Sequence, residues 1–157
     1  MTLLKENHSI YVAGSNGMVG SSICRLLIKN GYILHHNLII SSRKELDLTD
    51  FKKVQNWFKK NKPDIVIIAS AKVGGIMANK SKPVEFLLEN MKIQNNLIQA
   101  SYEYGVKRLL FLGSSCIYPK FAKQPIKEKF LLSGNLEISN QWYAIAKIAG
   151  LKLCDAY

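Results

Sequence analysis

The stretch SIYVAGSNGMVGSS, residues 9–22, decides which fold we expect for this chain. An apolar run leads directly into Gly14-Ser15-Asn16-Gly17-Met18-Val19-Gly20, and a segment with helical spacing follows. Glycines between a strand and a helix permit a tight turn and a close approach of the backbone to a phosphate, which the helix N-terminus attracts. The spacing is GxxGxxG rather than GxGxxG, but the physical argument is the same. The stretch therefore predicts a dinucleotide site at residues 14–20.

The rest of the chain repeats this alternation of strand and helix. Short, continuous apolar runs predict strands buried on both faces, at residues 9–14, 37–42, 64–70 and 108–115. Helical spacing occupies residues 18–31, 49–63, 83–105 and 139–157. We expect Thr49 or Asp50 to cap the second helix, and Ser139 or Asn140 the last. Alternating strands and helices predict an α/β fold, a Rossmann-like doubly wound parallel sheet.

Composition narrows the class of protein. The 157 residues are 48% hydrophobic and 21% charged, which is typical of a soluble globular domain. No apolar run approaches the roughly 20 residues that a membrane helix needs, and we expect a cytoplasmic protein without a membrane partner. The net charge of +11 is spread over many lysines with only three arginines, so we expect no nucleic-acid partner. Three scattered cysteines indicate neither a disulfide framework nor a metal site.

The segment after the second expected strand bears on which dinucleotide binds. An NAD site expects an acidic residue there, to bind the ribose hydroxyl. No Asp or Glu occurs from Asn7 through Lys44, and Ser41-Ser42-Arg43-Lys44 stands at the expected position. The two cations would suit a 2′-phosphate, which favours NADP over NAD; the alternative is an ordinary basic loop.

Two further segments carry groups suited to catalysis. GSSCIYPK, residues 113–120, places serines and a cysteine at a strand end, and YAIAK, residues 143–147, follows on a helix. Tyr143 and Lys147 are four residues apart and share one helix face, where the ammonium should lower the pKa of the phenol. Such a tyrosine can exchange a proton with a substrate oxygen that a strand-end serine also binds. The YxxxK spacing alone is common in amphipathic helices.

Four stretches, VAGSNGMVGS, SAKVGGIMAN, LLFLGSSCIYPKFAKQPIKE and WYAIAKIAGLKLC, carry a resemblance. They resemble the extended short-chain dehydrogenase/reductase superfamily and, within it, the GDP-L-fucose synthase family. The resemblance runs from about Ile10 to Tyr157 and covers only the N-terminal half of that family. We therefore expect one NADP-binding domain over residues 1–157, truncated before the C-terminal strands and the substrate domain.

The resemblance implies roles for individual residues. Ser114 matches the serine of the catalytic triad, Tyr143 its proton donor, Lys147 its contact to the cofactor ribose, and Cys116 the family's epimerisation acid/base. Ser15-Asn16 stands where the family usually has His-Arg, so one phosphate contact is missing. The implied cofactor-binding residues are Gly14, Ser15, Asn16, Gly17, Met18, Val19, Gly20, Arg43, Lys44, Glu45, Leu46, Asp47, Leu48, Leu112, Gly113, Ser114, Ser115 and Lys147.

The resemblance also implies a reaction and partners. It is the NADP-dependent conversion of GDP-4-keto-6-deoxy-D-mannose to GDP-L-fucose, by epimerisation at carbons 3 and 5 and reduction at carbon 4. A GDP-sugar would be the substrate. A homodimer would form through residues 83–104 and 140–157, and a separately encoded C-terminal half is a further expected partner. Two alternatives stay open: a non-catalytic nucleotide-binding half, and another NAD(P)-dependent nucleotide-sugar epimerase or dehydratase.

Overall fold

The computed structural model describes residues 8–157; the first seven residues of the expected domain lie outside the described part. The chain forms two compact units. The first contains the residues up to Ala71 together with Lys92–Leu112, and the second contains Lys72–Met91 together with Gly113–Tyr157. Each unit is described separately below.

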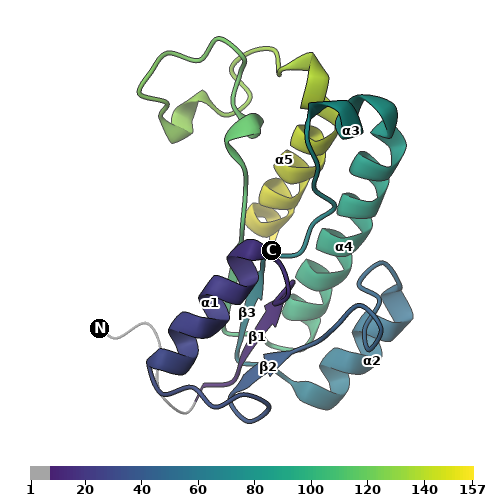
Figure 1. Ribbon diagram of the computed structural model, residues 1–157, viewed down its shortest axis with the longest axis vertical. Helices are drawn as coiled ribbons and strands as arrows, with labels where there is room; N and C mark the ends of the chain where they lie inside the picture. Colours follow the sequence, from purple (N-terminus) through teal and green to yellow (C-terminus); the bar gives the residue numbers. More distant parts are fainter. Residues whose placement is uncertain (1–7) are drawn as a thin grey trace. The chain divides into compact units, whose positions relative to one another are not determined.

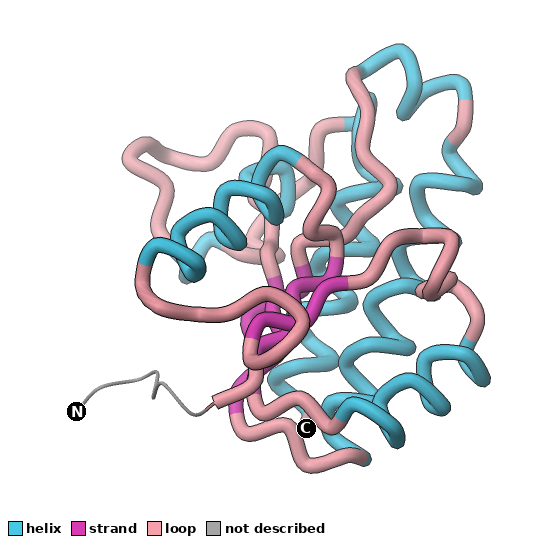
Figure 2. The backbone as a smooth tube through the Cα atoms, turned by 60° about the horizontal axis from the view of Figure 1, so that its bottom comes forward, coloured by secondary structure: helices cyan, strands magenta, loops and turns pink. Residues whose placement is uncertain are grey.

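The first unit is built on a parallel sheet of four strands, seen at the centre of Figure 2. The strands are β1 (Ile10–Ala13), β2 (Leu38–Ile40), β3 (Ile65–Ile68) and β4 (Arg108–Phe111), in the order β2-β1-β3-β4. All three pairings are parallel. The four predicted strands and the Rossmann-like doubly wound parallel sheet are confirmed, although each strand is shorter than its apolar run.

Helices cover both faces of this sheet (Figure 1). Ile10 and Val12 of β1 point toward α1 (Met18–Lys29) and belong to a buried cluster that includes Leu27. Tyr11, which alternates with them, points to the other face, where its ring lies 4.2 Å from that of Trp57 on α2 (Phe51–Asn61). A strand buried on both faces needs an unbroken apolar sequence, which is why β1 does not alternate with polar residues. Burial of each such side chain contributes about 1.5–3 kcal/mol.

The helix ends follow the expected chemistry in part. Asp50 caps α2, and its carboxylate accepts a hydrogen bond of 3.0 Å from the Lys53 N–H, as predicted. Gly31 follows α1 with φ of +90°, a conformation that favours glycine. Asn140 occupies the N-cap position of α5 (Gln141–Ala156), but its side chain makes no capping hydrogen bond. The predicted N-cap position at Asn140 is therefore confirmed, but the hydrogen bond expected from its side chain is not formed.

The second unit consists of helices and turns. It contains α3 (Ile76–Ser81), α5, and three short 3₁₀ turns, η1 (Ser115–Ile117), η2 (Glu128–Phe130) and η3 (Ile138–Asn140). The helix α5 packs against η1 and η3, and α3 packs against η3. The long helix α4 (Pro83–Glu103) belongs to both units, which divide between Met91 and Lys92. The sequence patterns did not predict α3, because six residues are too few to establish a helical period.

Candidate active site

The glycine loop between β1 and α1 is a tight turn in which two of the glycines leave no room for a side chain. Gly14 has φ of +86°, and a Cβ there would lie 2.6 Å from the Ser70 backbone nitrogen, at the end of the neighbouring strand. At Gly20, on the first turn of α1, a Cβ would lie 2.1 Å from the Gly14 carbonyl oxygen. Gly17 closes the turn by donating its N–H to the same oxygen at 3.0 Å. The first and third glycines are therefore needed for close backbone contacts, and the loop brings the start of α1 to the end of β1.

This loop has the features of an anion site. No side chain caps α1 at Gly17, and its first turn contains no acidic residue, so no side chain of that turn neutralises the partial positive charge of the helix N-terminus. The hydroxyls of Ser15 and Ser70 are buried without a hydrogen-bond partner among the described residues. A buried hydroxyl without a partner costs free energy unless a ligand or water binds it. Residues 14–20 with Ser70 therefore fit a diphosphate.

The loop after β2 has a definite conformation. At the start of this loop, the Ser41 hydroxyl is hydrogen-bonded to the Tyr11 hydroxyl of β1 at 2.7 Å. Burial raises the pKa of Tyr11 to about 12, so this phenol stays protonated. The Glu45 carboxylate accepts the Ser42 N–H at 2.7 Å, and this bond lowers the pKa of Glu45. Glu45 is thus an acidic residue of this loop, and its carboxylate stabilises the turn.

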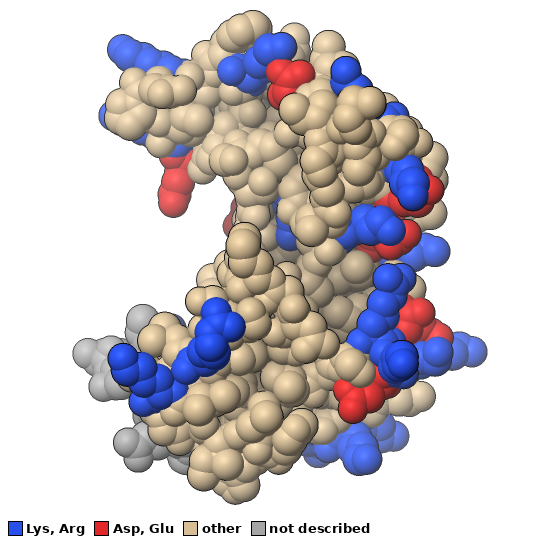
Figure 3. Space-filling model, in the orientation of Figure 1, with Lys and Arg blue, Asp and Glu red and all other residues tan. Residues whose placement is uncertain are grey.

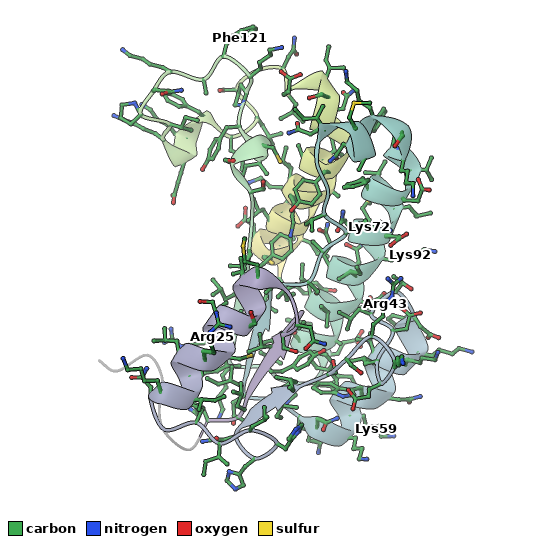
Figure 4. All side chains as sticks on the ribbon, in the orientation of Figure 1. Arg25, Arg43, Lys59, Lys72, Lys92 and Phe121 are labelled. Carbon is green, nitrogen blue, oxygen red and sulfur yellow. The ribbon has the colours of Figure 1, made fainter. Side chains whose placement is uncertain are left out.

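The predicted cofactor residues of this loop differ in how they can act. Arg43 and Lys44 are exposed, and Figure 4 shows Arg43 in the loop that follows β2. Leu46 is only 3% exposed, so its side chain is part of the core. The Asp47 carboxylate accepts from the Thr49 N–H and hydroxyl, and the Leu48 carbonyl accepts from the Asn96 amide at 2.9 Å. Only Arg43 and Lys44 leave cationic side chains available to a bound phosphate.

The second unit brings the predicted catalytic residues into one cluster. Ser114 is the N-cap of η1, and the Cys116 sulfur lies 3.1 Å from its hydroxyl oxygen. The α5 residues Tyr143 and Lys147 complete the cluster, with the Lys147 ammonium 5.9 Å from the centre of the Tyr143 ring. The packing of α5 on η1 places both of these side chains in electrostatic contact with Cys116. Four residues that are separated by up to 33 positions in sequence therefore form one group.

The electrostatics of this cluster correct one expectation. Burial raises the pKa of Tyr143, and the charge of a Cys116 thiolate would raise it further. The prediction of a lowered phenol pKa is therefore wrong, because burial is the main cause of the shift and acts in the opposite direction. Burial also lowers the pKa of Lys147 to about 8, since the amine is almost entirely enclosed in the protein. Near neutral pH the tyrosine thus keeps its proton, and the lysine lies close to its titration range.

Three other predicted cofactor residues lie between β4 and the cluster. The Leu112 N–H continues the sheet by donating to the Ile68 carbonyl at 3.3 Å. Gly113 has room for a side chain, because a Cβ there would meet nothing closer than 3.8 Å. The Ser115 carbonyl accepts the Tyr118 N–H and closes η1. These residues lead the chain from the strand end to Ser114, and nothing in their packing requires glycine at position 113.

The sequence analysis missed one residue that organises the site region. Asn90 on α4 is buried, and its amide accepts the Lys72 N–H at 2.7 Å and donates to the Lys72 carbonyl at 3.0 Å. It thereby holds the backbone that follows β3, where Figure 4 labels Lys72. The signal for this role in the sequence is weak, because Gln94, Asn96 and Ser101 of the same helix are also buried polar residues. Which backbone atoms it holds depends on the tertiary fold.

An open pocket of about 960 Å³ lies in the second unit, within the loop from Pro119 to Gln141. Its lining is mainly apolar and includes Phe121, Phe130 and Ile138. The Lys120 ammonium in its wall is paired with the Glu137 carboxylate at 2.7 Å. Lys123 also lines the pocket, and we assign the pocket no role.

Within residues 8–157, no three His, Cys, Asp or Glu side chains are grouped so that they could bind a metal ion. None of the helices in that range has the length and hydrophobicity needed to cross a membrane. On the face drawn in Figure 3, the Lys and Arg side chains form several separate groups, and acidic side chains lie beside several of these groups.

Comparisons with known proteins agree with this architecture. The model of the NAD dependent epimerase/dehydratase family matches residues 10–157. The chain is 55% identical over 152 residues to GDP-L-fucose synthase 1 of Arabidopsis thaliana, covering 97% of this chain and 46% of that protein. It is 51% identical over 154 residues to GDP-L-fucose synthase of Sinorhizobium fredii, covering 98% and 48%.

A solved structure matches equally well over the whole chain. MlghC, a GDP-mannoheptose C4 reductase from Campylobacter jejuni with NADP bound, superimposes with a TM-score of 0.93 at 38% identity. The match covers 98% of this chain and 45% of that one. The chain therefore spans about half the length of the relatives that it matches.

Proposed function

The chain belongs to the NAD dependent epimerase/dehydratase family, and we propose on that basis that it is the NADP-binding and catalytic part of a GDP-L-fucose synthase. Residues 8–157 would form the cofactor domain, and the surfaces that bind the GDP-sugar would come from a further domain or chain. The observation that carries the proposal is the clustering of Ser114, Cys116, Tyr143 and Lys147 in a chain that also has the glycine loop.

The cofactor is NADPH in this proposal. Residues 14–20 and Ser70 hold its diphosphate. The buried hydroxyls of Ser15 and Ser70 have no hydrogen-bond partner among the described residues, and no side chain caps the N-terminus of α1. Arg43, with Lys44 beside it, binds the 2′-phosphate, because both are exposed cations in the loop after β2. When bound, the cofactor supplies a hydride to carbon 4 of the keto sugar. Relatives of known structure support the choice, since MlghC was solved with NADP bound.

The cluster divides the remaining work between its residues. Cys116 exchanges protons at the carbons that flank the ketone, and a second acid/base from outside residues 8–157 delivers the proton to the opposite face, so that carbons 3 and 5 are epimerised. Tyr143 protonates the alkoxide that forms at carbon 4 during reduction. The raised pKa of this phenol supports that role, because it keeps a proton available to donate. Lys147 binds the cofactor ribose and places a positive charge beside the reacting groups.

The proposed substrate is GDP-4-keto-6-deoxy-D-mannose, and Cys116 supports a reaction that includes epimerisation. A second candidate is a GDP-sugar reductase that does not epimerise, because MlghC, a C4 reductase by name, is similar over the whole chain. Product analysis separates the two candidates. Replacement of Cys116 by Ser should abolish epimerisation and leave reduction in the first case, and should leave the product unchanged in the second.

A homodimer remains part of the proposal. Two of the apolar side chains on α4, Phe86 and Ile98, are buried within the chain at 1% and 3% exposure and cannot contribute to an interface. Leu88 and Tyr102 on the same helix are exposed at 47% and 63%, and are the side chains we propose for contact with a partner.

Titration of the chain with NADPH and NADH, followed by nicotinamide fluorescence, tests the cofactor assignment. We expect NADPH to bind more tightly, and Arg43→Ala to weaken NADPH by about 1.5–3 kcal/mol with little effect on NADH. Arg25→Ala is the matched control, because Arg25 is an exposed arginine on α1 outside the proposed site. Equal affinity for the two nucleotides in the wild-type chain would exclude the assignment.

Turnover tests the catalytic assignment. The expected result is no loss of NADPH absorbance with the 157-residue chain alone. Activity should appear when the C-terminal half of a relative is supplied, and Tyr143→Phe should then abolish reduction. A chain that binds NADPH but stays inactive with every added C-terminal half would favour a non-catalytic nucleotide-binding module.

A further inference from the structure

Ser114 and Cys116 are joined by two hydrogen bonds that both enter the serine hydroxyl. The Cys116 thiol donates to the Ser114 Oγ at 3.1 Å, and the Cys116 backbone N–H donates to the same atom at 3.4 Å. The N–H bond is the capping bond of η1, which fixes the hydroxyl oxygen next to the sulfur. The role expected from the sequence, binding of a substrate oxygen by the strand-end serine, does not use this contact.

This contact uses most of the hydrogen-bonding capacity of the Ser114 hydroxyl. A serine hydroxyl has one proton to donate and two lone pairs to accept with. Cys116 supplies both of the donors that enter Ser114 Oγ, so both lone pairs are occupied while the sulfur is protonated. The hydroxyl proton is then the remaining hydrogen-bonding capacity of Ser114, and it is available to a substrate oxygen.

Loss of the thiol proton reverses the direction of this bond. A thiolate has no proton to donate and accepts strongly, and the Ser114 O–H is a donor already within 3.1 Å of the sulfur. We propose that Ser114 is a positioning residue for Cys116, whose single hydroxyl proton binds either the thiolate or the substrate oxygen. This inference rests on the proposed epimerase-reductase function, because it assumes that Cys116 exchanges protons with a keto sugar.

The reversal couples two events within the epimerisation step. The Cys116 thiolate takes a proton from the carbon beside the ketone, so that a C–H bond breaks and an S–H bond forms. The electron pair of the C–H bond moves to the ketone oxygen, which becomes an enolate. Because the new thiol donates to Ser114, the serine proton leaves the sulfur and can bind the enolate oxygen as its negative charge develops. No other reactant is needed for this exchange.

Two other groups face Cys116, and the test must separate their effects. Tyr143 and Lys147 both project from α5, the element that packs on η1. The ammonium of Lys147 favours a thiolate through its charge, and the Tyr143 phenol is a possible second donor. Neither group is altered by a substitution at Ser114, so the contribution of the hydroxyl can be measured against this constant background.

The experiment measures the alkylation of Cys116 by iodoacetamide between pH 5 and pH 10 in the nucleotide-free chain. The thiolate is the reactive form, so the rate at each pH reports its population. Mass spectrometry of tryptic peptides gives the rate for each cysteine separately, and Cys24 and Cys154 serve as internal references. The variants are Ser114→Ala, Ser114→Thr and Ser114→Val, with Ser133→Ala as a matched control at an exposed serine of the same unit.

We expect the midpoint of the Cys116 rate to rise by about 1 pH unit in the Ala and Val variants, because the thiolate loses a hydrogen-bond donor. Thr keeps the hydroxyl and should give the wild-type midpoint, as should Ser133→Ala. If the Ala variant does not fold, the comparison of Thr with Val, which have nearly the same shape, decides the question. Midpoints that do not differ between the Thr and Val variants would overturn the proposal.

The outcome is independent of the test of the proposed function, since the assay contains no nucleotide or substrate. A chain that binds NADPH but shows the same Cys116 midpoint in all Ser114 variants retains its proposed function and loses this role of Ser114. A chain that shows the expected shift but binds no NADPH retains the serine–cysteine coupling and loses the proposed function.

Discussion

Replacement of Gly20 by alanine should separate the folding role of the glycine loop from its binding role. The added Cβ would lie 2.1 Å from the Gly14 carbonyl oxygen and 2.7 Å from the Gly14 carbonyl carbon. Ordinary contacts of a Cβ begin near 3.4 Å, so α1 would have to move away from the turn by about 1 Å. The obstructing atoms are backbone atoms of the same turn and cannot swing aside as a side chain could.

The expected cost of Gly20→Ala follows from what that movement disrupts. Leu27 of α1 packs on Ile10 and Val12 of β1, so a displaced helix loses contacts with the sheet core. Overpacking of a rigid site typically costs 1–3 kcal/mol, and contact with the backbone of both Gly14 and Ser15 places this change at about 3 kcal/mol. For a domain of this size, such a loss should lower the melting temperature by roughly 10 °C.

The assay is thermal unfolding followed by circular dichroism, with NADPH titration below the transition. Gly17→Ala is the matched control, because its Cβ would lie 3.3 Å from the Gly14 oxygen and needs a shift of only a few tenths of an ångström. We expect Gly17→Ala to retain most of the stability. A Gly20→Ala protein with the melting temperature of the wild type would refute the argument that close backbone packing requires this glycine.

Four further predictions follow from buried or paired groups. Lys147→Met should stabilise the chain by about 1–3 kcal/mol at pH 7, because it removes a buried amine whose pKa is lowered to about 8. Denaturant titrations should show this gain shrinking between pH 8 and 10.5. In that range the wild type becomes more stable with rising pH, because its unfolded state binds more protons than its folded state. Asp64→Asn should destabilise by about 1 kcal/mol at pH 7, and the difference should disappear as the pH falls from 3.8 toward the folded-state pKa of about 2; a difference that persists at pH 2 would contradict this. Asn90→Ala should release the clamped backbone and make the peptide bond after Lys72 sensitive to trypsin in limited proteolysis, while an unchanged digest would show that the clamp is dispensable. Leu110→Lys should reduce self-association in light scattering, because β4 is an edge strand and Leu110 is 50% exposed on it; equal scattering by variant and wild type would count against association through this edge.

Local patterns were sufficient to predict most of the fold. The continuous apolar runs at β1 and β3 predicted strands buried on both faces, because a strand covered by helices on both sides has no face that is open to water. The cap at Asp50 was also predictable from a local pattern, since it depends only on residues three positions apart. The six-residue helix α3 was not predictable, and its polar Asn79 is held by the Gly74 and Gly75 carbonyls rather than by a periodic pattern.

The sequence predicted which residues form the candidate site, but not how deeply each is buried or which backbone atoms lie beside it. The spacing of Tyr143 and Lys147 placed both on one helix face, but the direction of the tyrosine pKa depends on how deeply the fold encloses it. The roles of Asn90 and Ser70 depend on which backbone atoms lie opposite them, and that information is not local. Arg43 as the phosphate ligand remains a prediction, because its exposure is compatible with the role but does not test it.

The strand order β2-β1-β3-β4 has a consequence for how the protein fails on heating. The inner strands β1 and β3 each pair with two neighbours, so their amide protons should exchange with solvent most slowly, while β4 should open earlier. The glycine loop continues directly from β1, whereas the segment leading to Ser114 continues from β4. Fraying of β4 would therefore disturb the segment that leads to Ser114 before the glycine loop, and a warmed protein should still bind NADPH after the amide protons of β4 have begun to exchange.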